Sequence, residues 1–310
     1  ELYFIKELKE LLQKANIKSD LFFDISPNPR EDEVSVGCKK YNDGSHDAII
    51  AIGGGSAMDG GKLICLTANN DIPLRDFEFE LTPPKISKDN PFPKIITIPT
   101  TAGTGAETEI TAMVTYLKEG MKFCMWHPDA RPVLALVDPE LTLGLPPSLT
   151  AWTGVDAMVH AIEGYCVPGF NPLCDGSAIE SLSLISKSLY LAVEEPKNLV
   201  ARGGMHVGSY LGGVAFLKGL GLVHAISHMV GAEFNTQHGL TNAIILPVVL
   251  RYNLSGMDEK VKRMSEAMQF EDHSIEAFIT NIEKMLDRLN IPKSLSEIGV
   301  PEDCVERIAK

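Results

Sequence analysis

The sequence lacks the features of secreted, membrane-spanning and nucleic-acid-binding proteins. It contains 28 Lys and Arg against 41 Asp and Glu, so it has no excess of positive charge that would attract a phosphate backbone. No apolar run reaches the ~18–20 residues that a transmembrane helix needs, and no basic segment followed by an apolar one indicates a secretory signal. The six cysteines form no CxxC pair and follow no disulfide-scaffold spacing, which is typical of reduced thiols. We therefore expect a cytoplasmic protein that binds neither nucleic acid nor a membrane.

The first half of the sequence alternates short apolar runs with helix-like segments. Continuous apolar runs of this length are typical of parallel strands that are buried on both faces. Four such runs occur, at Leu21–Ile25, Ala48–Ile52, Ile95–Ile98 and Val133–Val137. Helical patterns at residues 31–42 and 56–68 flank the second run, and this alternation indicates βαβ units. These patterns predict a Rossmann-like α/β domain with a parallel sheet.

Strand-like runs end at Pro146 and Pro147. From Ser148 to Lys310 the pattern is amphipathic and helical, and Ser148 fits the N-cap of a first long helix. A chain of 310 residues is long enough for two domains of ~100–200 residues each. We therefore predict an α/β domain at residues 1–146 and an all-α domain at residues 147–310.

A glycine-rich turn follows the second apolar run and leads into a predicted helix. Its residues are Gly53, Gly54, Gly55 and Ser56, with Asp59 in the helix. Glycines at the carboxyl end of a buried strand let backbone N–H groups approach a ligand, and the helix N-terminus adds partial positive charge that suits a pyrophosphate. A tight turn without a ligand explains the same residues equally well, and the turn is not a GxGxxG fingerprint.

A second turn of similar chemistry follows the run at Ile95–Ile98. It contains glycines and the hydroxyl side chains Thr100, Thr101 and Thr104. Each threonine alone can be an ordinary turn or capping residue. Two such turns at the carboxyl ends of two parallel strands, however, face the one crevice where open α/β sheets bind ligands. The pair of turns favours a dinucleotide site.

The helical half contains a group of residues that is typical of a metal centre. Asp156 and His160 are four residues apart, so both side chains lie on one helical face. His224 and His228 form a second such pair, and His238 follows. One carboxylate with neutral imidazoles suits a transition metal. A single buried histidine is more often a core residue than a ligand, but the joint pattern favours metal binding.

Together these motifs resemble the iron-containing, group III alcohol dehydrogenase family, and within it most closely the lactaldehyde-reductase branch. The turn at residues 53–59 is similar to the family's pyrophosphate turn, residues 100–105 to its second nucleotide loop, and residues 137–147 to its domain junction. The resemblance covers residues 20–255. It implies a dehydroquinate synthase-like architecture, with a dinucleotide-binding first domain and a metal-binding second domain. The metal ligands that it implies are Asp156, His160, His224 and His238.

The resemblance also implies roles for residues elsewhere in the chain. His228 matches the histidine beside the nicotinamide, where it would move a proton or shape the pocket, and Phe216 matches a residue of the substrate pocket. The implied cofactor-binding residues are Asn28, Gly53, Gly54, Gly55, Ser56, Asp59, Thr100, Thr101, Thr104 and Lys122. Glu109 stands where the family often has a threonine near the nicotinamide. The sequence also lacks the family's first strands, with the acidic residue that meets the ribose, and ends some tens of residues before the family's usual end.

The implied activity is hydride transfer between a small alcohol or aldehyde and NAD or NADP. Fe2+ would polarise the substrate oxygen in such an enzyme, and Zn2+ is an alternative metal. Three other interpretations remain open at this point: a zinc-dependent enzyme of the glycerol-dehydrogenase type, an enzyme of the dehydroquinate-synthase type, and a truncated NAD-binding fragment without activity. The pair Asp156 and His160 argues against the first two. We expect a homo-oligomer, with a dimer as the expected form.

Overall fold

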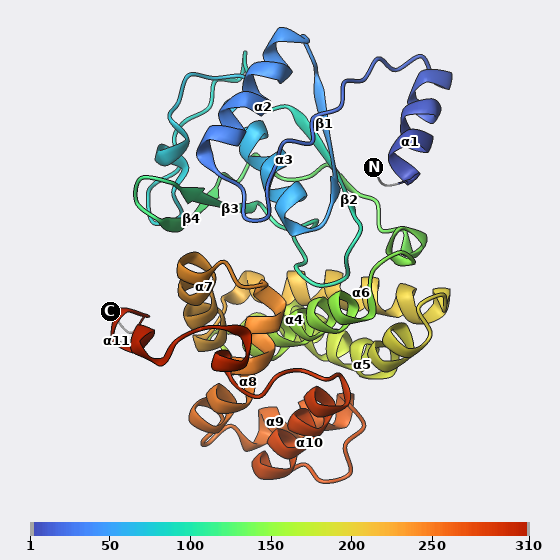
Figure 1. Cartoon of the computed structure of the whole chain (residues 1–310), viewed down its shortest axis with the longest axis vertical. Coiled ribbons are helices and arrows are strands. Elements are labelled where there is room, and N and C mark those ends of the chain that lie inside the picture. Colours follow the sequence, from blue (N-terminus) through green and yellow to red (C-terminus); the bar gives the residue numbers. More distant parts are fainter. Residues whose placement is uncertain (1–2, 309–310) are drawn as a thin grey trace.

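The computed structural model describes residues 3–308, in which an α/β half is stacked on a helical half (Figure 1). The α/β half contains α1 (Tyr3–Lys14), α2 (Glu31–Asp43), β1 (Ala48–Gly53), α3 (Gly55–Thr67), η1 (Leu74–Phe77), β2 (Lys94–Pro99), β3 (Thr111–Tyr116), β4 (Met121–Trp126) and β5 (Leu134–Ala135). The helical half contains η2 (Pro139–Thr142), α4 (Pro147–Cys166), α5 (Pro172–Glu194), α6 (Leu199–Ala215), η3 (Phe216–Lys218), α7 (Leu222–Phe234), α8 (His238–Asn253), α9 (Asp258–Ala267), α10 (Ile275–Arg288), η4 (Leu295–Ile298), η5 (Glu302–Cys304) and α11 (Val305–Ile308).

The main sheet has the strand order β1-β2-β5, and both pairs of strands are parallel. Ile49 lies opposite Ile95 and Thr97 lies opposite Ala135. Helix α3 follows β1 directly and packs on the sheet, and its Gly61 leaves room for Ala51 of β1. The predicted Rossmann-like arrangement of parallel strands and helices is confirmed, as is the all-helical second half.

Three local predictions need correction. The apolar run Leu21–Ile25 is not a strand: Phe22 packs on the hydrophobic core, Ile25 lies over Gly60 of α3, and no strand of residues 3–308 pairs with the run. Phe22 and Ile25 are apolar because they cover α2 and α3, whereas Phe23 is exposed. The run Val133–Val137 forms only the two-residue edge strand β5.

Ser148 is not an N-cap, because α4 already begins at Pro147. Proline has no N–H to lose at the first helical position, so the helix starts two residues earlier than an N-cap at Ser148 predicts.

An antiparallel hairpin of β3 and β4 was not predicted from the sequence. Its register pairs Thr111 with Trp126 and Tyr116 with Met121. Burial alternates along most of β3, but β4 begins at the exposed Met121 and is mostly half-buried, so no regular alternation extends over both strands. The hairpin matters for the site because it carries Lys122.

Each half has its own hydrophobic core. Met58, Leu63 and Ile95 belong to the core of the α/β half, and Val155 and Leu182 to that of the helical half.

No single helix of residues 3–308 is long and apolar enough to cross a bilayer. The helices at residues 199–218 and 222–234 reach that length and apolarity only when they are taken together, and the chain bends by 103° between them. The domain boundary near residue 146 stays a prediction.

Candidate active site

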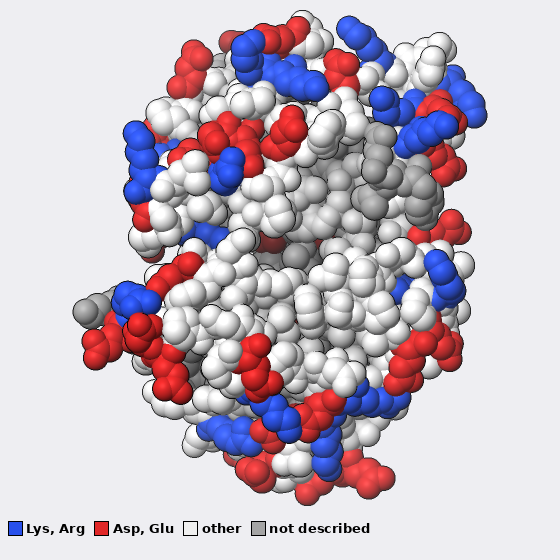
Figure 2. Space-filling model, viewed as in Figure 1, with Lys and Arg blue, Asp and Glu red and all other residues white. Residues whose placement is uncertain are grey.

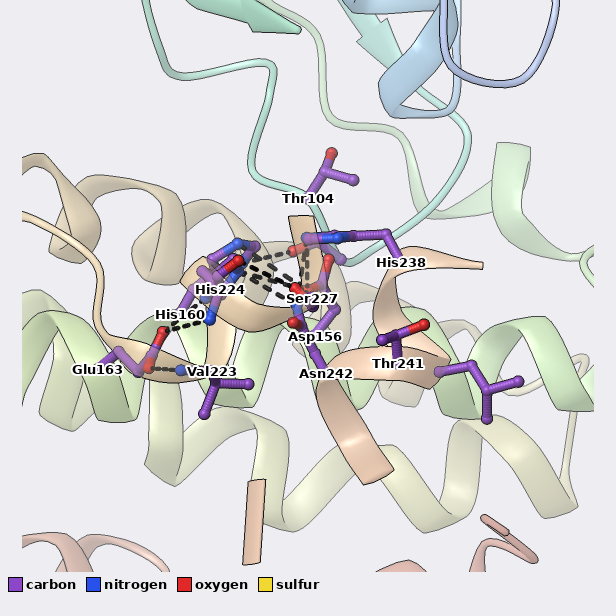
Figure 3. A network of polar contacts seen from close by, with 12 residues as sticks. Thr104, Asp156, His160, Glu163, Val223, His224, Ser227, His238, Thr241 and Asn242 are labelled. Atoms are coloured by element: carbon purple, nitrogen blue, oxygen red, sulfur yellow. Dashed lines mark hydrogen bonds and ion pairs between the residues drawn. The ribbon is translucent and has the colours of Figure 1, made fainter. Parts of the chain in front are cut away.

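Three helices bring one carboxylate and three imidazoles together (Figure 3). Asp156 and His160 lie one turn apart on α4, His224 is in the first turn of α7, and His238 begins α8. Asp156 Oδ1 lies 4.0 Å from His160 Nε2, 3.8 Å from His224 Nε2 and 3.6 Å from His238 Nε2. One ligand atom from each residue lies within 4.8 Å of all the others. Four tetrahedral ligands at metal–ligand distances of 2.0–2.2 Å are about 3.4 Å apart, so the cluster fits a divalent ion.

The protonation states also suit a cation. Burial would raise the pKa of Asp156, but His160, His238 and His224 and a hydrogen bond outweigh it, so the pKa lies below its ordinary value. Burial lowers the pKa of His224 well below its ordinary value, and that of His238 in the same direction. A charged carboxylate beside neutral imidazoles is the state in which these groups bind a metal.

Three groups outside the four residues fix their orientation, and sequence reasoning missed them. His160 Nδ1 lies 3.2 Å from the carbonyl oxygen of Gly103, and His224 Nδ1 lies 2.6 Å from Glu163 Oε2. Asn242 Nδ2 donates to Asp156 Oδ1 at 2.7 Å. Helical spacing could have signalled the two side chains, because Glu163 is three residues after His160 and Asn242 is four after His238.

The two glycine-bearing turns lie against each other above the metal cluster. Thr100 N–H donates to the carbonyl oxygen of Gly53 at 2.8 Å. A Cβ added to Gly55 would lie 2.8 Å from Thr104 Cγ2, whereas one added to Gly54 would meet Thr101 at an ordinary 3.5 Å. The turns therefore form one surface, as the sequence predicts.

This surface has unused hydrogen-bonding groups. The N-terminus of α3 at Gly54 has no side-chain cap; Ala57 N–H donates to the Gly54 carbonyl oxygen, and the N–H groups of Gly55 and Ser56 before it are the donors that a ligand would meet. Thr101 Oγ1 is buried and has no partner among residues 3–308. Free donors at a helix N-terminus suit the pyrophosphate of a dinucleotide.

Asn28, Ser56 and Lys122 meet at the side of the same surface. Asn28 N–H donates to Ser56 Oγ at 3.2 Å, and Lys122 Nζ donates to Asn28 Oδ1 at 2.7 Å. Asn28 Nδ2 also donates to Asn235 Oδ1 at 2.7 Å, which links the α/β half to the end of α7. The hairpin and the loop before α2 thus place three predicted cofactor residues together.

Carboxyl groups lie beside this lysine. Loss of hydration raises the pKa of Asp59 to about 7, with opposing effects from Lys62 and a further increase from Glu109. Burial also raises the pKa of Glu109, whose carboxylate accepts a hydrogen bond from Thr111 Oγ1. Burial lowers the pKa of Lys122.

His228 and Phe216 line the space around the cluster without joining the four ligand atoms. The His228 ring stacks on His238 with centroids 5.2 Å apart, and burial is the main cause that lowers its pKa to about 3. The Phe216 ring lies 4.8 Å from the His160 ring. Their predicted roles stay predictions, as do the roles of the other site residues.

Known proteins are similar to this chain in both sequence and fold. Residues 1–139 match the family profile described as iron-containing alcohol dehydrogenase, and residues 150–310 match the Fe-containing alcohol dehydrogenase family, C-terminal. The NAD-dependent methanol dehydrogenase of Bacillus methanolicus is 34% identical over 98% of this chain and 81% of its own length. Lactaldehyde reductase of Escherichia coli strain K12 is 34% identical over 99% of this chain and 81% of its own. A crystal structure of 1,3-propanediol oxidoreductase superposes with a TM-score of 0.93 at 33% identity, covering 98% of this chain and 80% of that one.

Proposed function

Because the chain belongs to the iron-containing alcohol dehydrogenase family, we propose that it transfers a hydride between a small alcohol or aldehyde and NAD. The family resemblance, including the likeness to lactaldehyde reductase, is what the sequence motifs predict. NAD is proposed over NADP because the methanol dehydrogenase relative is NAD-dependent. The proposed metal is Fe2+, held by Asp156, His160, His224 and His238.

One observation carries this proposal: the four ligand atoms converge within 4.8 Å directly below the turn that would hold a dinucleotide. The carbonyl oxygen of Gly103, in the second turn, contacts His160 Nδ1 at 3.2 Å. A nicotinamide lying on the turns would therefore come close to a substrate at the metal cluster. Hydride transfer needs this proximity of cofactor and substrate.

The chain's own residues have distinct tasks in this mechanism. A bound divalent ion would act as a Lewis acid on the oxygen of the alcohol or aldehyde. Gly54 and Thr101 would hold the pyrophosphate, and Lys122 the ribose. His228 stands beside His238 without belonging to the ligand cluster, where it would relay the hydroxyl proton or shape the pocket around the nicotinamide. Phe216 would exclude water from the reacting atoms.

The test is an anaerobic assay of the purified chain with Fe2+, and in parallel with Zn2+, NAD or NADP and a series of small primary alcohols and diols. We expect reduced nicotinamide to form with Fe2+ and NAD. Dinucleotide binding, measured by nicotinamide fluorescence, should persist without metal. Activity with Zn2+ and not with Fe2+ would favour the zinc-dependent alternative. Dinucleotide binding without turnover under every condition would contradict the proposed function.

We propose further that the protein is a cytoplasmic homodimer that binds neither nucleic acid nor a membrane. All six cysteines are free thiols, which supports a reducing compartment. On the face in Figure 2, acidic and basic side chains alternate without a continuous basic area. Exposed apolar side chains on the helical half, among them Leu173, Val200 and Leu217, offer surface for a second copy. Light scattering of the purified chain tests the dimer.

A further inference from the structure

Glu163 stands between two of the helices that form the metal cluster. It lies on α4, three residues after His160, and is 5% exposed. Its Oε2 atom is 2.6 Å from His224 Nδ1, and its Oε1 atom accepts the backbone N–H of Val223 at 2.7 Å. In Figure 3 the carboxylate lies on the side of the His224 ring away from Asp156. One buried carboxylate therefore holds both the start of α7 and the imidazole that α7 carries.

This contact determines which nitrogen of His224 has the proton. Both oxygens of Glu163 accept backbone N–H groups, from Val223 and His224, so this side chain acts as an acceptor; Nδ1 of His224 then carries the hydrogen and Nε2 is the unprotonated nitrogen. Nε2 is the atom that faces Asp156 Oδ1, at 3.8 Å. We propose, on the basis of the proposed function, that Glu163 is a positioning residue that selects His224 as the α7 ligand and holds it in the metal-binding tautomer.

The same contact explains why His224 rather than His228 belongs to the cluster. Both histidines lie on one face of α7, one turn apart, so the helical spacing alone does not separate them. Glu163 accepts from the backbone N–H groups of Val223 and, at 3.4 Å, His224, and thereby fixes where α7 starts. That start places His224 opposite Asp156 and leaves His228 one turn further along.

Gly221 supports the same arrangement from the other side. A Cβ added to Gly221 would lie 2.6 Å from Glu163 Oε1. The atom it meets is the end of a side chain, so the carboxylate would move while the backbone remained in place. Gly221→Ala is therefore a way to displace the carboxylate without changing its chemistry.

Glu163→Gln is the sharpest test, because an amide has one acceptor and one donor end. If the amide oxygen accepts from Val223 N–H, its NH2 group faces Nδ1 of His224 and forces the proton onto Nε2, where the metal should bind. If the amide is reversed, NH2 faces the backbone N–H of Val223, and the start of α7 loses its cap. Either orientation weakens metal binding.

The measurement is a Co2+ titration of the purified metal-free chain, read from the visible absorption of tetrahedral cobalt and from competition with a chelator. We expect Glu163→Gln and Gly221→Ala to weaken Co2+ binding by ~10–100-fold, the usual effect of losing a partner of a ligating histidine. Glu163→Asp keeps the charge and should recover part of the affinity. Matched controls are Glu180→Gln, exposed on α5, and Gly176→Ala, whose added Cβ meets nothing within 4 Å. Both controls should bind Co2+ like the parent chain.

Imidazole nitrogen NMR on the metal-free chain provides a readout that needs no bound metal. The parent chain should show His224 with its proton on Nδ1, and Glu163→Gln should move that proton to Nε2 or mix the two forms. Equal Co2+ affinity and an unchanged His224 tautomer in Glu163→Gln would overturn the role of Glu163 while leaving the proposed function intact. A parent chain that binds no Co2+ would overturn both.

Discussion

Gly54 is the residue where a cofactor can come closest to the first turn. Its backbone, at φ −79° and ψ −174°, is open to any residue, and an added Cβ meets only Thr101 at 3.5 Å. Gly54→Val should therefore fold normally, while its side chain fills the space that a pyrophosphate must enter. We expect NAD affinity to fall at least about tenfold, equivalent to about 1.4 kcal/mol, as measured by fluorescence titration.

Metal content distinguishes this local effect from misfolding, because Gly54→Val should keep the metal content of the parent chain. Gly144→Val is the control, since an added Cβ there meets nothing within 4 Å and Gly144 lies far from the turn in sequence. Parent-like NAD affinity in a folded Gly54→Val chain would show that the turn binds no pyrophosphate.

Some residues of the site could be predicted from the sequence, and others could not. Asp156, His160, His224 and His238 could be proposed from helical spacing and the number of nearby histidines, and the family resemblance separated His228 from these ligands. Glu163 lies on the same helical face as His160, but a buried glutamate has many possible partners. Its partner is 61 residues away on another helix. Only the packing of α4 against α7 identifies that contact.

At the scale of elements, the turn after β2 is seated on the helical half through glycine contacts. A Cβ added to Gly213 of α6 would lie 2.6 Å from Thr108 Oγ1 and 3.0 Å from Gly105 Cα. Backbone atoms cannot yield as a side chain can, so Gly213→Ala should push the turn away from α6. We expect a loss of about 1–3 kcal/mol in the free energy of unfolding, measured by chemical denaturation.

Metal affinity should fall in the same variant, because Gly103 in the same turn orients His160. Gly203→Ala on the same helix is the matched control: nothing lies within 4 Å of its added Cβ, and alanine favours helix by up to about 1 kcal/mol. If Gly213→Ala were as stable as Gly203→Ala, the close packing of turn and helix would not hold.

Sequence patterns predicted some of the strands correctly and failed for others. The strands β1 and β2 were predictable because both faces are covered, so their apolar runs are continuous. The run Leu21–Ile25 is similarly rich in apolar residues, yet it forms no strand. Apolar side chains indicate that a segment is buried, but they do not show whether it pairs with another strand. The β3–β4 hairpin was missed because its residues are mixed in polarity, although its two strands are neighbours in sequence and are joined by the turn at residues 117–120.

For the molecule as a whole, a buried carboxyl group makes stability depend on pH. Burial raises the pKa of Glu107 from 4.5 to about 7. The folded state therefore keeps this proton up to about pH 7, whereas the unfolded chain releases it near pH 4.5. Its contribution to the free energy of unfolding consequently falls as the pH rises through this range and is constant above it.

Glu107→Gln stays uncharged at every pH. We expect it to be more stable than the parent chain above pH 7, by up to about 3 kcal/mol, with the gain disappearing as the pH falls to 4.5. Thermal unfolding across this pH range measures the effect, with Glu180→Gln as an exposed control. A gain of the same size at both ends of the range would mean that titration of Glu107 is not its cause.

The most direct measurement is the metal content of His224→Ala and His228→Ala, taken together with their steady-state rates. His224→Ala should lose both metal and turnover, because it removes one of the four converging ligands. His228→Ala should keep the metal content of the parent chain and lose about 10²-fold or more in turnover, the usual effect of removing a general acid–base. If His228→Ala emptied the site, or if His224→Ala kept its metal and its rate, the assignment of Asp156, His160, His224 and His238 as the metal centre of this dehydrogenase would be wrong.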